Sequence, residues 1–495
     1  MMIFRHTSLL LLLFISLFYG CTYENDKVSA LKSERIPNIE PDYTSLIIPP
    51  DIAPLNFVIN EEGSVYYVDF SISGNSFFKL TSRNNTIKIP SGKWKNLLQN
   101  GVGKEFFINI IIKDKSGEIT IYEPIKNRIA AEPADPFITY RVIYPGYESW
   151  RELEIRQRDL TDFTSRAVIK NTLAEENCIN CHSFNNGRTG DFLFHMRGSR
   201  GGTYFCSDDK LEKHNLKPSE LKNGAVYPRW HPSGRFVAFS SNKIVQRFHA
   251  LNNKKVEVSD LESSLVLYDR DTNEILPVFF GSDSSFMDTY PEWSPDGKTL
   301  YFCRAPQIGE IYDYRSIHYN LWKVTFDPDK RTFGREEMIY NASKEDRSIS
   351  FPRISPDGKY IVVTMADYGC FPIWHKEADI FAFDLEAGSM ERLDLNSEFT
   401  DSYHSFSSNG HWIVFASRRG NGSVTRPYIA YFDENGKSGK AFLLPQVNPL
   451  SDKSFLKSFN LPEFSTVRLD FTPGQIRKAS KKEALNAKWF TNDSI

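Results

Sequence analysis

The chain has 495 residues, with 60 Lys and Arg against 62 Asp and Glu, so its formal net charge is −2. A balance this close to zero excludes the basic character expected of a nucleic-acid-binding protein or of a polybasic membrane patch. The hydrophobic fraction of 40%, with 38 Phe and 23 Tyr, is enough for large cores, and the length indicates two or three domains.

The start of the chain is typical of an export signal. A short basic start is followed by an apolar run, Leu9–Phe18, that is too short to span a bilayer. The run leads to Gly20-Cys21, which resembles the bacterial lipobox, in which the cysteine is diacylated. An ordinary secretory signal with an incidental cysteine is the alternative. We expect residues 1–20 to be a lipoprotein signal peptide, Cys21 to carry lipid, and the polar residues 21–44 to form a tether.

Residues 45–130 contain short runs of alternating apolar and polar residues, each bounded by turn residues. The runs 64–70 and 106–112 are the clearest examples. This pattern is typical of half-buried strands in a small β-sandwich of immunoglobulin-like size. We expect the next residues, 131–177, to form a connector that packs the sandwich against the following domain.

Four later segments share one pattern: an aromatic residue, usually a proline, a short turn that ends in glycine, and then an alternating strand. They are 227–234, 290–297, 351–358 and 403–410, and their glycines are 63, 61 and 52 residues apart. Repeating all-β units of this length predict propeller blades. We therefore expect residues 178–495 to form a single propeller of roughly five to seven blades. Residues 444–495 either close its ring or run over its surface.

The segment Cys178–His182 is a C-x-x-C-H motif. Two thiols at this spacing can add to the vinyl groups of one haem, and the imidazole of His182 then ligates the iron, so the motif predicts a covalent haem c on Cys178 and Cys181. Haem c is attached outside the cytoplasm, which agrees with the export signal. The alternatives are a disulfide, half of a zinc site, or two buried cysteines followed by an unrelated histidine. The other cysteines of the mature chain are too scattered for a disulfide framework: Cys206, Cys303 and Cys370.

Aligned on the turn glycines, the motif lies in the first blade, with Cys181-His182 where the next blade has Trp230-His231. In the following strand, His195 replaces a residue that is apolar in the other blades, and Met196 replaces a smaller one. Either could be the sixth iron ligand, but strand alternation places them on opposite faces, so both cannot ligate. In the structural alternative, His195 bonds a backbone carbonyl and Met196 fills space. His214 is a further candidate.

Arginines close to the motif are candidate partners for haem propionates. Arg197 and Arg200 lie in a glycine-rich loop that follows the motif, although a solvated hairpin tip has the same composition. Weaker candidates of the same kind are Arg158, Arg418 and Arg419.

Together, the signal, the sandwich, the C-x-x-C-H motif and the repeats resemble the TolB-type, WD-repeat-like (PD40) β-propeller lipoproteins of Bacteroidota-type bacteria that carry a cytochrome c-like motif. The resemblance to the propeller covers roughly residues 178–445. It implies an all-β fold and a lipid-anchored protein of the cell envelope, at the outer membrane.

The functions to be expected belong to different classes. The first is a haem protein that transfers electrons or senses redox state or haem, with an envelope protein as its partner. The alternative is a propeller without haem that recruits a protein or glycan. A hydrolase with its site in the central channel is a third class. No G-x-S-x-G, H-E-x-x-H or phosphate-binding motif occurs, so an enzyme would most simply use haem redox chemistry.

Overall fold

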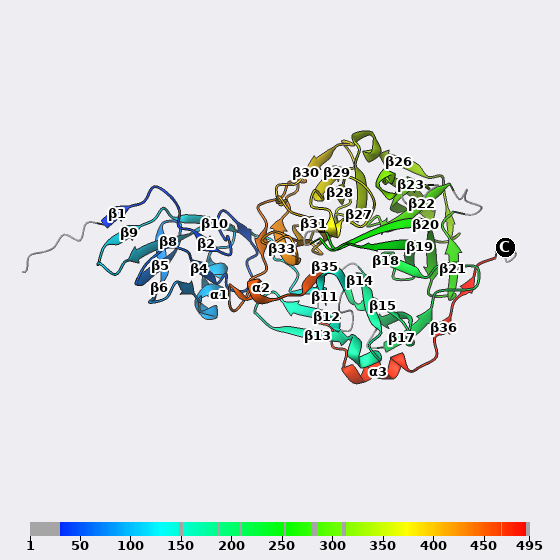
Figure 1. Ribbon diagram of the computed structural model, residues 1–495, viewed down its shortest axis with the longest axis horizontal. Coiled ribbons are helices and arrows are strands. Elements are labelled where there is room, and N and C mark those ends of the chain that lie inside the picture. The colour runs from blue at the N-terminus through cyan, green and yellow to red at the C-terminus, as the bar shows by residue number, and fades with distance from the viewer. Residues whose placement is uncertain are drawn as a thin grey trace, which may run out of the picture.

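The structure is a computed structural model that describes residues 30–147, 152–185, 188–207, 210–251, 254–279, 285–308, 313–466 and 468–491. The expected signal peptide and Cys21 lie outside the described residues. Within them the fold is all β, as predicted, with a smaller N-terminal domain beside a propeller (Figure 1). No described helix has the length and apolar character needed to cross a bilayer.

The N-terminal domain contains two sheets and a helix. Its larger sheet consists of β1 (Ala30–Lys32), β3 (Ile47–Ile48), β5 (Val65–Ile72), β6 (Asn75–Ser82), β8 (Glu105–Lys113), β9 (Ile119–Ile121) and β10 (Ile125–Ile129). Its smaller sheet consists of β2 (Ile39–Glu40), β4 (Phe57–Ile59) and β7 (Thr86–Ile87). Helix α1 (Ser91–Asn100) packs Trp94 edge-on against Phe70 and Phe106. The domain begins inside the expected tether, because β1 pairs with β9. Its immunoglobulin-like character stays a prediction.

The first three blades of the propeller follow one another along the chain. Blade 1 consists of β14 (Cys178–Asn185), β15 (Arg188–Arg197), β16 (Gly202–Ser207) and β17 (Lys210–Asn215). Blade 2 consists of β18 (Ala225–Trp230), β19 (Phe236–Phe248), β20 (Val256–Asp269) and β21 (Glu274–Pro277). Blade 3 consists of β22 (Phe286–Trp293), β23 (Thr299–Pro306), β24 (Asn320–Asp327), β25 (Thr332–Phe333) and β26 (Glu337–Tyr340).

Three further blades complete the ring. Blade 4 consists of β27 (Ser348–Ile354), β28 (Tyr360–Ala366), β29 (Asp379–Asp384) and β30 (Met390–Arg392). Blade 5 consists of β31 (Asp401–Phe406), β32 (Trp412–Ser417), β33 (Arg426–Tyr431) and β34 (Phe442–Leu443). Blade 6 consists of β35 (Ser458–Ser465), β11 (Phe137–Ile143), β12 (Glu154–Asp159) and β13 (Ser165–Lys170). Each inner strand contacts the inner strand of the next blade, and β35 contacts β14, so the ring is closed.

Blade 6 joins two distant parts of the chain. Its inner strand β35 pairs antiparallel with β11, from Phe137 opposite Ser465 to Ile143 opposite Ser458. Residues 131–177, expected to be a connector, therefore supply the three outer strands of a blade. These strands lack the alternation of apolar and polar residues by which strands are predicted. β11 is buried on both faces, and β12 consists almost entirely of polar residues.

The last described residues run along the outside of the propeller. Helix α3 (Pro473–Ser480) begins with a capping box between Thr472 and Gln475, and it packs against β13 and β17. Strands β36 (Leu485–Asn486) and β37 (Lys488–Trp489) then add a parallel fifth strand to blades 1 and 2. The C-terminal residues thus both close the ring and cover its surface. The remaining helical turns of the described residues are η1 (Pro145–Tyr147), η3 (Asn171–Ala174), η4 (Tyr314–Ser316), η5 (Ala342–Glu345), η6 (Pro372–Trp374) and α2 (Ser451–Ser454).

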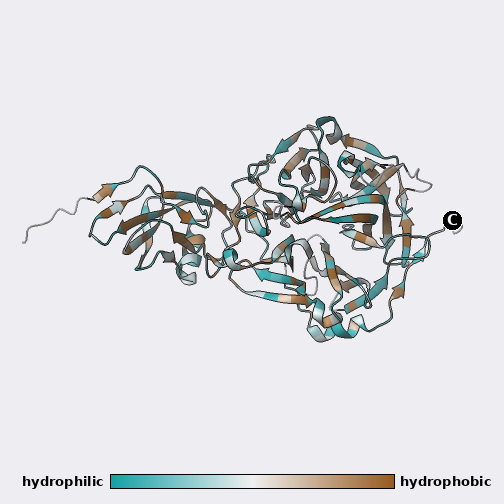
Figure 2. Ribbon diagram, in the orientation of Figure 1, coloured by the Kyte–Doolittle hydropathy of each residue, from teal (hydrophilic) through white to brown (hydrophobic). Residues whose placement is uncertain are grey.

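Apolar residues along the strands (Figure 2) form cores between adjacent blades and inside the N-terminal domain. One core extends across both domains: Trp94 and Phe106 belong to the same buried cluster as Trp412 and Phe442 of blade 5 and Ile138 of blade 6. The two domains therefore share a continuous apolar interface rather than a solvated hinge.

Every inner strand has a bulge at one left-handed residue. The residues concerned, with φ between 51° and 53°, are Cys181, Tyr227, Tyr290, Phe351, Tyr403 and Leu461. Residues other than glycine rarely adopt left-handed backbone angles. Because a left-handed residue occurs at the bulge of all six inner strands, these six positions align the blades residue by residue.

That alignment shows that two details of the sequence alignment are wrong. Cys181-His182 corresponds to Tyr227-Pro228, and Phe184 is the counterpart of Trp230. The turn of blade 1 also holds one residue more than that of blade 2, because Phe184 pairs with Phe192 while Trp230 pairs with Val237. His195 therefore corresponds to Ser240 of blade 2, a position occupied by small residues, and not to Phe239.

Candidate functional site

The central channel is filled by side chains of the left-handed residues. Tyr227, Tyr290, Phe351 and Tyr403 pack in sequence, with ring centroids 4.4, 4.3 and 4.5 Å apart. Leu461 and Cys181 complete the ring of six. Because a thiol is much smaller than an aromatic ring, blade 1 leaves a space in this plug: a cavity of about 50 Å³ lined by Cys181, His182 and residues of the other blades.

His182 is buried beside this cavity. Only 7% of its surface is exposed, and neither ring nitrogen has a hydrogen-bond partner among the described residues. Burial, with a smaller contribution from Arg141, lowers the pKa of His182 to about 4, while the backbone of Thr139 and of Leu461 acts weakly in the opposite direction. The imidazole is therefore neutral at physiological pH, which is the form that ligates a metal.

The two motif thiols open on different spaces. Cys178 borders a surface hollow of about 400 Å³ together with Glu175, Asn177 and Arg197, whereas Cys181 borders the channel cavity. Both cysteines are free and partly exposed. The other described cysteines are free and buried, and burial raises the pKa of each thiol: Cys206, Cys303 and Cys370.

The two candidate distal ligands lie on opposite faces of β15. Met196 packs in the core that blade 1 shares with blade 6, beside Ile179, and it is fully buried. His195 lies on the other face, where its Nδ1 is 3.2 Å from the hydroxyl oxygen of Thr203. Burial lowers the pKa of His195 to about 4. Since the backbone near His182 belongs to blade 6, Met196 is on the same side of the strand as His182, and His195 is not.

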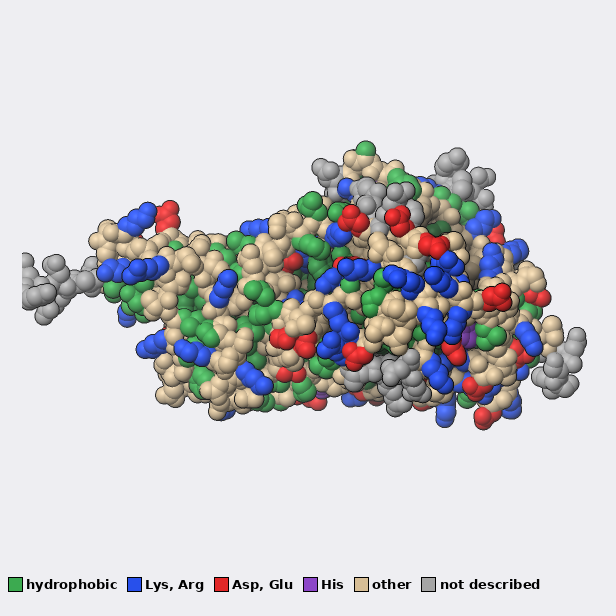
Figure 3. Space-filling model, turned by 90° about the horizontal axis from the view of Figure 1, so that it is seen from below, with side chains coloured by type: hydrophobic (Ala, Val, Ile, Leu, Met, Phe, Trp, Pro, Cys, Tyr) green, Lys and Arg blue, Asp and Glu red, His purple; other side chains and the backbone are tan. Residues whose placement is uncertain are grey.

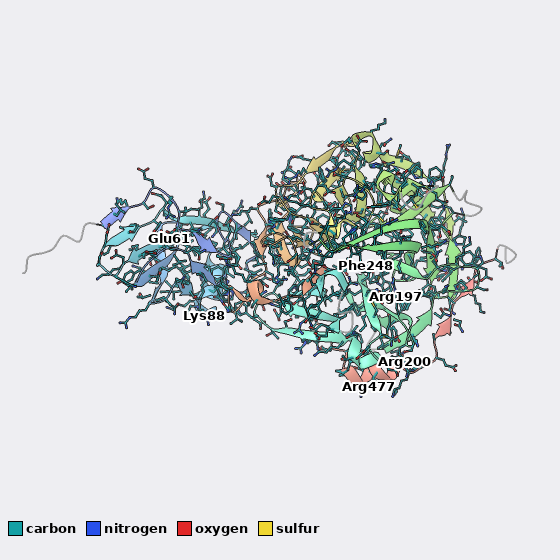
Figure 4. The ribbon with its side chains drawn as sticks, in the orientation of Figure 1. Glu61, Lys88, Arg197, Arg200, Phe248 and Arg477 are labelled. Atoms are coloured by element: carbon teal, nitrogen blue, oxygen red, sulfur yellow. The ribbon has the colours of Figure 1, made fainter. Side chains whose placement is uncertain are left out.

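The structure does not bring His214 to the motif. It lies on β17, the fourth strand of blade 1, with Nδ1 2.8 Å from the hydroxyl of Tyr268. Of the two loop arginines, Arg197 lines the hollow beside Cys178, and Arg200 pairs with Glu175 at 2.5 Å. Figure 4 labels both on blade 1, Arg200 beside Arg477 of α3 and Arg197 farther from it. On one face of the propeller, Lys and Arg side chains gather with acidic side chains among them (Figure 3).

The other candidate arginines have structural partners instead. Arg158 donates to the carbonyl of Pro445 at 2.6 Å, and Arg418 donates to the carbonyl of Ile373. Arg419 pairs with the buried Asp401 at 2.9 Å. These three side chains are therefore engaged away from the motif.

Sequence reasoning missed a group of charged residues in the channel, here called the channel quartet: Arg229, Glu292, Arg353 and Glu463. Each lies two residues after the left-handed residue of its inner strand. Arg229 holds Glu292 with two contacts of 2.6 and 3.1 Å, Arg353 reaches Glu292 at 3.3 Å, and Glu463 lies 3.7 Å from Arg229. The signal was present, because Leu461-Pro462-Glu463-Phe464 repeats the pattern of Tyr290-Pro291-Glu292-Trp293.

A second charged cluster was also missed. The hairpin of β19 and β20 extends beyond its blade, and Phe248 near its tip is 65% exposed (Figure 4). Its Glu257 lies 3.3 Å from His375 of blade 4 and 2.6 Å from Lys254. Val256 packs in the same core as the aromatic plug, so this cluster fastens the hairpin over the channel end.

The motif fits a haem in its chemistry but not in the space around it. A neutral imidazole with unpartnered nitrogens next to two free thiols is the donor set that haem c requires. The cavity of about 50 Å³ beside Cys181 is too small for a porphyrin, and Cys178 opens on a separate hollow. Among the described residues, no group of three or more His, Cys, Asp or Glu side chains could hold a metal ion.

No protein-family model matches the sequence, and no curated protein matches it. Solved structures with some likeness include a chain of a nidogen/laminin complex, with a TM-score of 0.39, 9% identity, and coverage of 67% of this chain and 100% of that one. A hypothetical selenium-binding protein from Sulfolobus tokodaii has a TM-score of 0.39 and 9% identity, over 68% and 94% of the chains. An oligogalacturonate lyase from Vibrio parahaemolyticus has a TM-score of 0.34 and 13% identity, over 76% and 100%.

Proposed function

We propose that the chain is an envelope lipoprotein whose propeller carries one covalent haem c, and that it serves electron transfer or redox or haem-linked sensing with an envelope protein as its partner. The observation that carries the proposal is the state of His182. Its two ring nitrogens have no partner in the described residues, although buried polar groups are almost always hydrogen-bonded. An iron atom would account for one of them.

Cys178 and Cys181 would hold the haem by thioether bonds, and His182 would be its proximal ligand. When bound, the group would supply one-electron chemistry. The chain's own residues keep the imidazole neutral, through burial and through the nearby Arg141. Met196, on the same side of β15, is better placed than His195 for the distal position.

The space around the motif sets a condition on this proposal. A porphyrin does not fit in the cavity of about 50 Å³ beside Cys181. Attachment therefore requires the inner strand of blade 1 to be arranged differently in the haem-bound protein, with both thiols on one side. Hydrogen exchange in β14 and β15 should change between protein produced with and without haem.

The test is production of the full chain in a host that attaches haem c, followed by intact mass and a pyridine haemochrome spectrum. We expect a mass increase of one haem that survives denaturation, and its loss in the double variant Cys178→Ser/Cys181→Ser. Cys206→Ser is the matched control, because its thiol is free but lies outside the motif. Protein that carries no haem after maturation, with both motif thiols unmodified, refutes the proposal.

The second candidate is a propeller without haem that binds a protein or glycan partner in the envelope. The observation that favours it is the small channel cavity beside Cys181, which does not admit a porphyrin. Specific capture of an envelope partner by the Cys178→Ser/Cys181→Ser variant, with the affinity of the wild-type protein, would support this function. Loss of capture in that variant would count against it.

A further inference from the structure

The channel quartet forms the floor of a cavity of about 250 Å³, here called the funnel, at the channel end where β18, β22 and β27 finish. Apolar side chains form its walls. They are Phe184, Trp230, Trp293, Ile354, Phe406 and Phe464, one from each blade. The funnel thus combines a charged floor with apolar walls, which is the arrangement expected for an amphipathic small molecule.

The floor retains unused hydrogen-bond donors. Among the described residues, the hydrogen bonds of Arg353 all involve Nη1, which donates to Glu292 at 3.3 Å and to the carbonyl of Pro352 at 2.7 Å. Arg229 uses Nε and Nη2 on Glu292, while its Nη1 lies 3.7 Å from Glu463, which is too far for a hydrogen bond. Nε and Nη2 of Arg353 and Nη1 of Arg229 are therefore left for a ligand.

Below neutral pH the floor carries less negative than positive charge. Burial raises the pKa of Glu463 to about 7, so below neutral pH Glu292 is the main carboxylate facing two guanidinium groups. Burial and the nearby Arg229 lower the pKa of Arg353 to about 10, which shows that the second guanidinium is poorly neutralised. The carboxylate at the mouth, Asp135, is already engaged by the backbone and hydroxyl of Ser408 at 2.8 and 2.5 Å.

We propose that the funnel binds a small organic acid, with its carboxylate on the free donors of Arg353 and Arg229 and its apolar part against Phe406 and Ile354. A guanidinium group presents a planar fork that matches a carboxylate. A cation is repelled by the two arginines. A neutral molecule of the same shape binds more weakly, because it supplies no counter-charge for Arg353.

The position of Glu463 makes binding depend on pH. Arg229 of β18, Arg353 of β27 and Glu292 of β22 face this carboxyl group, and the N–H of Phe184 in β14 donates to it at 3.4 Å. His404 of β31 stays neutral, because burial lowers its pKa to about 3. A bound carboxylate favours the protonated form of Glu463, so affinity falls as pH rises above 7.

The test is calorimetric titration of the full mature protein with benzoate and with its neutral analogue benzyl alcohol. We expect saturable binding of benzoate that is at least about tenfold tighter than binding of benzyl alcohol, and a loss of at least about tenfold in Arg353→Met. Arg392→Met is the matched control on the outer strand of the same blade, where Arg392 pairs with Asp379, and it should bind like wild type.

Glu463→Gln provides an arm that does not depend on Arg353. The amide resembles the protonated carboxyl group, so this variant should bind benzoate with the wild-type affinity at about pH 6 and keep it at about pH 8.5, where the wild type weakens about tenfold or more. Equal affinity for benzyl alcohol, no saturable binding of benzoate to the wild type, or an unchanged affinity in a folded Arg353→Met overturns the proposal.

Discussion

His404 of blade 5 occupies the position that His182 occupies in blade 1, since each directly follows the left-handed residue of its inner strand. Nε2 of His404 donates to the carbonyl of Val362 in the preceding blade at 2.9 Å. The counterpart of Val362 in blade 6 is Thr139, whose backbone lies near His182. His404 thus joins two blades by a hydrogen bond of normal length, whereas neither ring nitrogen of His182 makes a bond of that geometry to the backbone beside it.

The first prediction follows from the burial of His404. Its pKa is lowered from 6.5 to about 3, so between these values the unfolded chain takes up a proton that the folded chain does not. Stability therefore falls as pH falls below 6.5, by on the order of 3 kcal/mol at pH 4 from this residue alone. Denaturant unfolding of His404→Gln across this pH range should show a shallower loss than the wild type. Parallel curves for the two proteins contradict the prediction.

The cluster of His375, Glu257 and Lys254, which fastens the hairpin, should lose stability as pH rises, whereas the contribution of His404 is lost as pH falls. The carboxylates of Glu257 and Glu377 raise the pKa of His375. This contribution is complete below pH 6.5 and is lost as pH rises through the folded pKa of His375. The pKa of Glu257 is about 2, so its part is present above 4.5 and is lost only as pH falls toward 2. Amide exchange in residues 256–262 should quicken with rising pH beyond the intrinsic increase, and this excess should vanish in His375→Gln. An unchanged excess would exclude His375 as its source.

A buried ion pair in blade 3 should be costly to break. Arg304 binds Asp288 at 2.6 and 3.0 Å and lies 4.7 to 5.2 Å from four aromatic rings: Phe279, Phe286, Phe302 and Trp322. Arg304→Met leaves a buried carboxylate unpaired, so we expect a loss of about 3–5 kcal/mol in the free energy of unfolding. The double variant Arg304→Met/Asp288→Asn should recover part of it. A double variant less stable than Arg304→Met would contradict this explanation.

Closure of the ring by β35 can be tested by truncation. Removing residues 458–495 deletes the inner strand of blade 6 and exposes the edge of β11, so the shortened protein should not fold cooperatively. Removing residues 468–495 deletes only the outer strap, and this protein should fold with a lower midpoint of thermal unfolding. Calorimetry of both proteins measures the difference. Similar unfolding of the two truncated proteins would show that β35 does not close the ring.

Lipidation of Cys21 is a prediction from the sequence, because the residue lies outside the described part of the chain. Cys21→Ser should release the protein from the detergent-soluble membrane fraction and remove the mass of the lipid. Cys206→Ser should leave both unchanged. Wild-type localisation and mass in Cys21→Ser would show that this cysteine is not the anchor.

The repeats predicted most of the propeller because blades 2 to 4 share a proline, a turn and a glycine at fixed spacing, and blade 5 keeps the turn and the glycine. Blade 6 was not predicted, because its inner strand has Leu461 in place of an aromatic residue and its outer strands come before blade 1 in the chain. The register of His195 could not be obtained from the sequence, because a turn one residue longer shifts every later side chain to the other face.

The candidate site was predicted only in part. Cys178, Cys181 and His182 were singled out by the local spacing of the C-x-x-C-H motif, and their role in holding a haem stays a prediction. The channel quartet was not found, because its members are contributed by four blades and meet only when the ring closes. Single charged residues such as Arg229 or Glu463 carry no signal until the left-handed positions align the blades.

The divided sixth blade also constrains how the chain can mature. Strands β11 to β13 emerge from the ribosome early, but the strand that pairs with β11 is synthesised only after all five other blades. Until then the early strands have an open edge that can pair with other chains. The propeller therefore cannot be completed progressively from its N-terminus during synthesis. A holding chaperone, or delivery of the whole chain before folding, would keep that edge from the wrong neighbours, and stalled or prematurely terminated chains should be an especially aggregation-prone population.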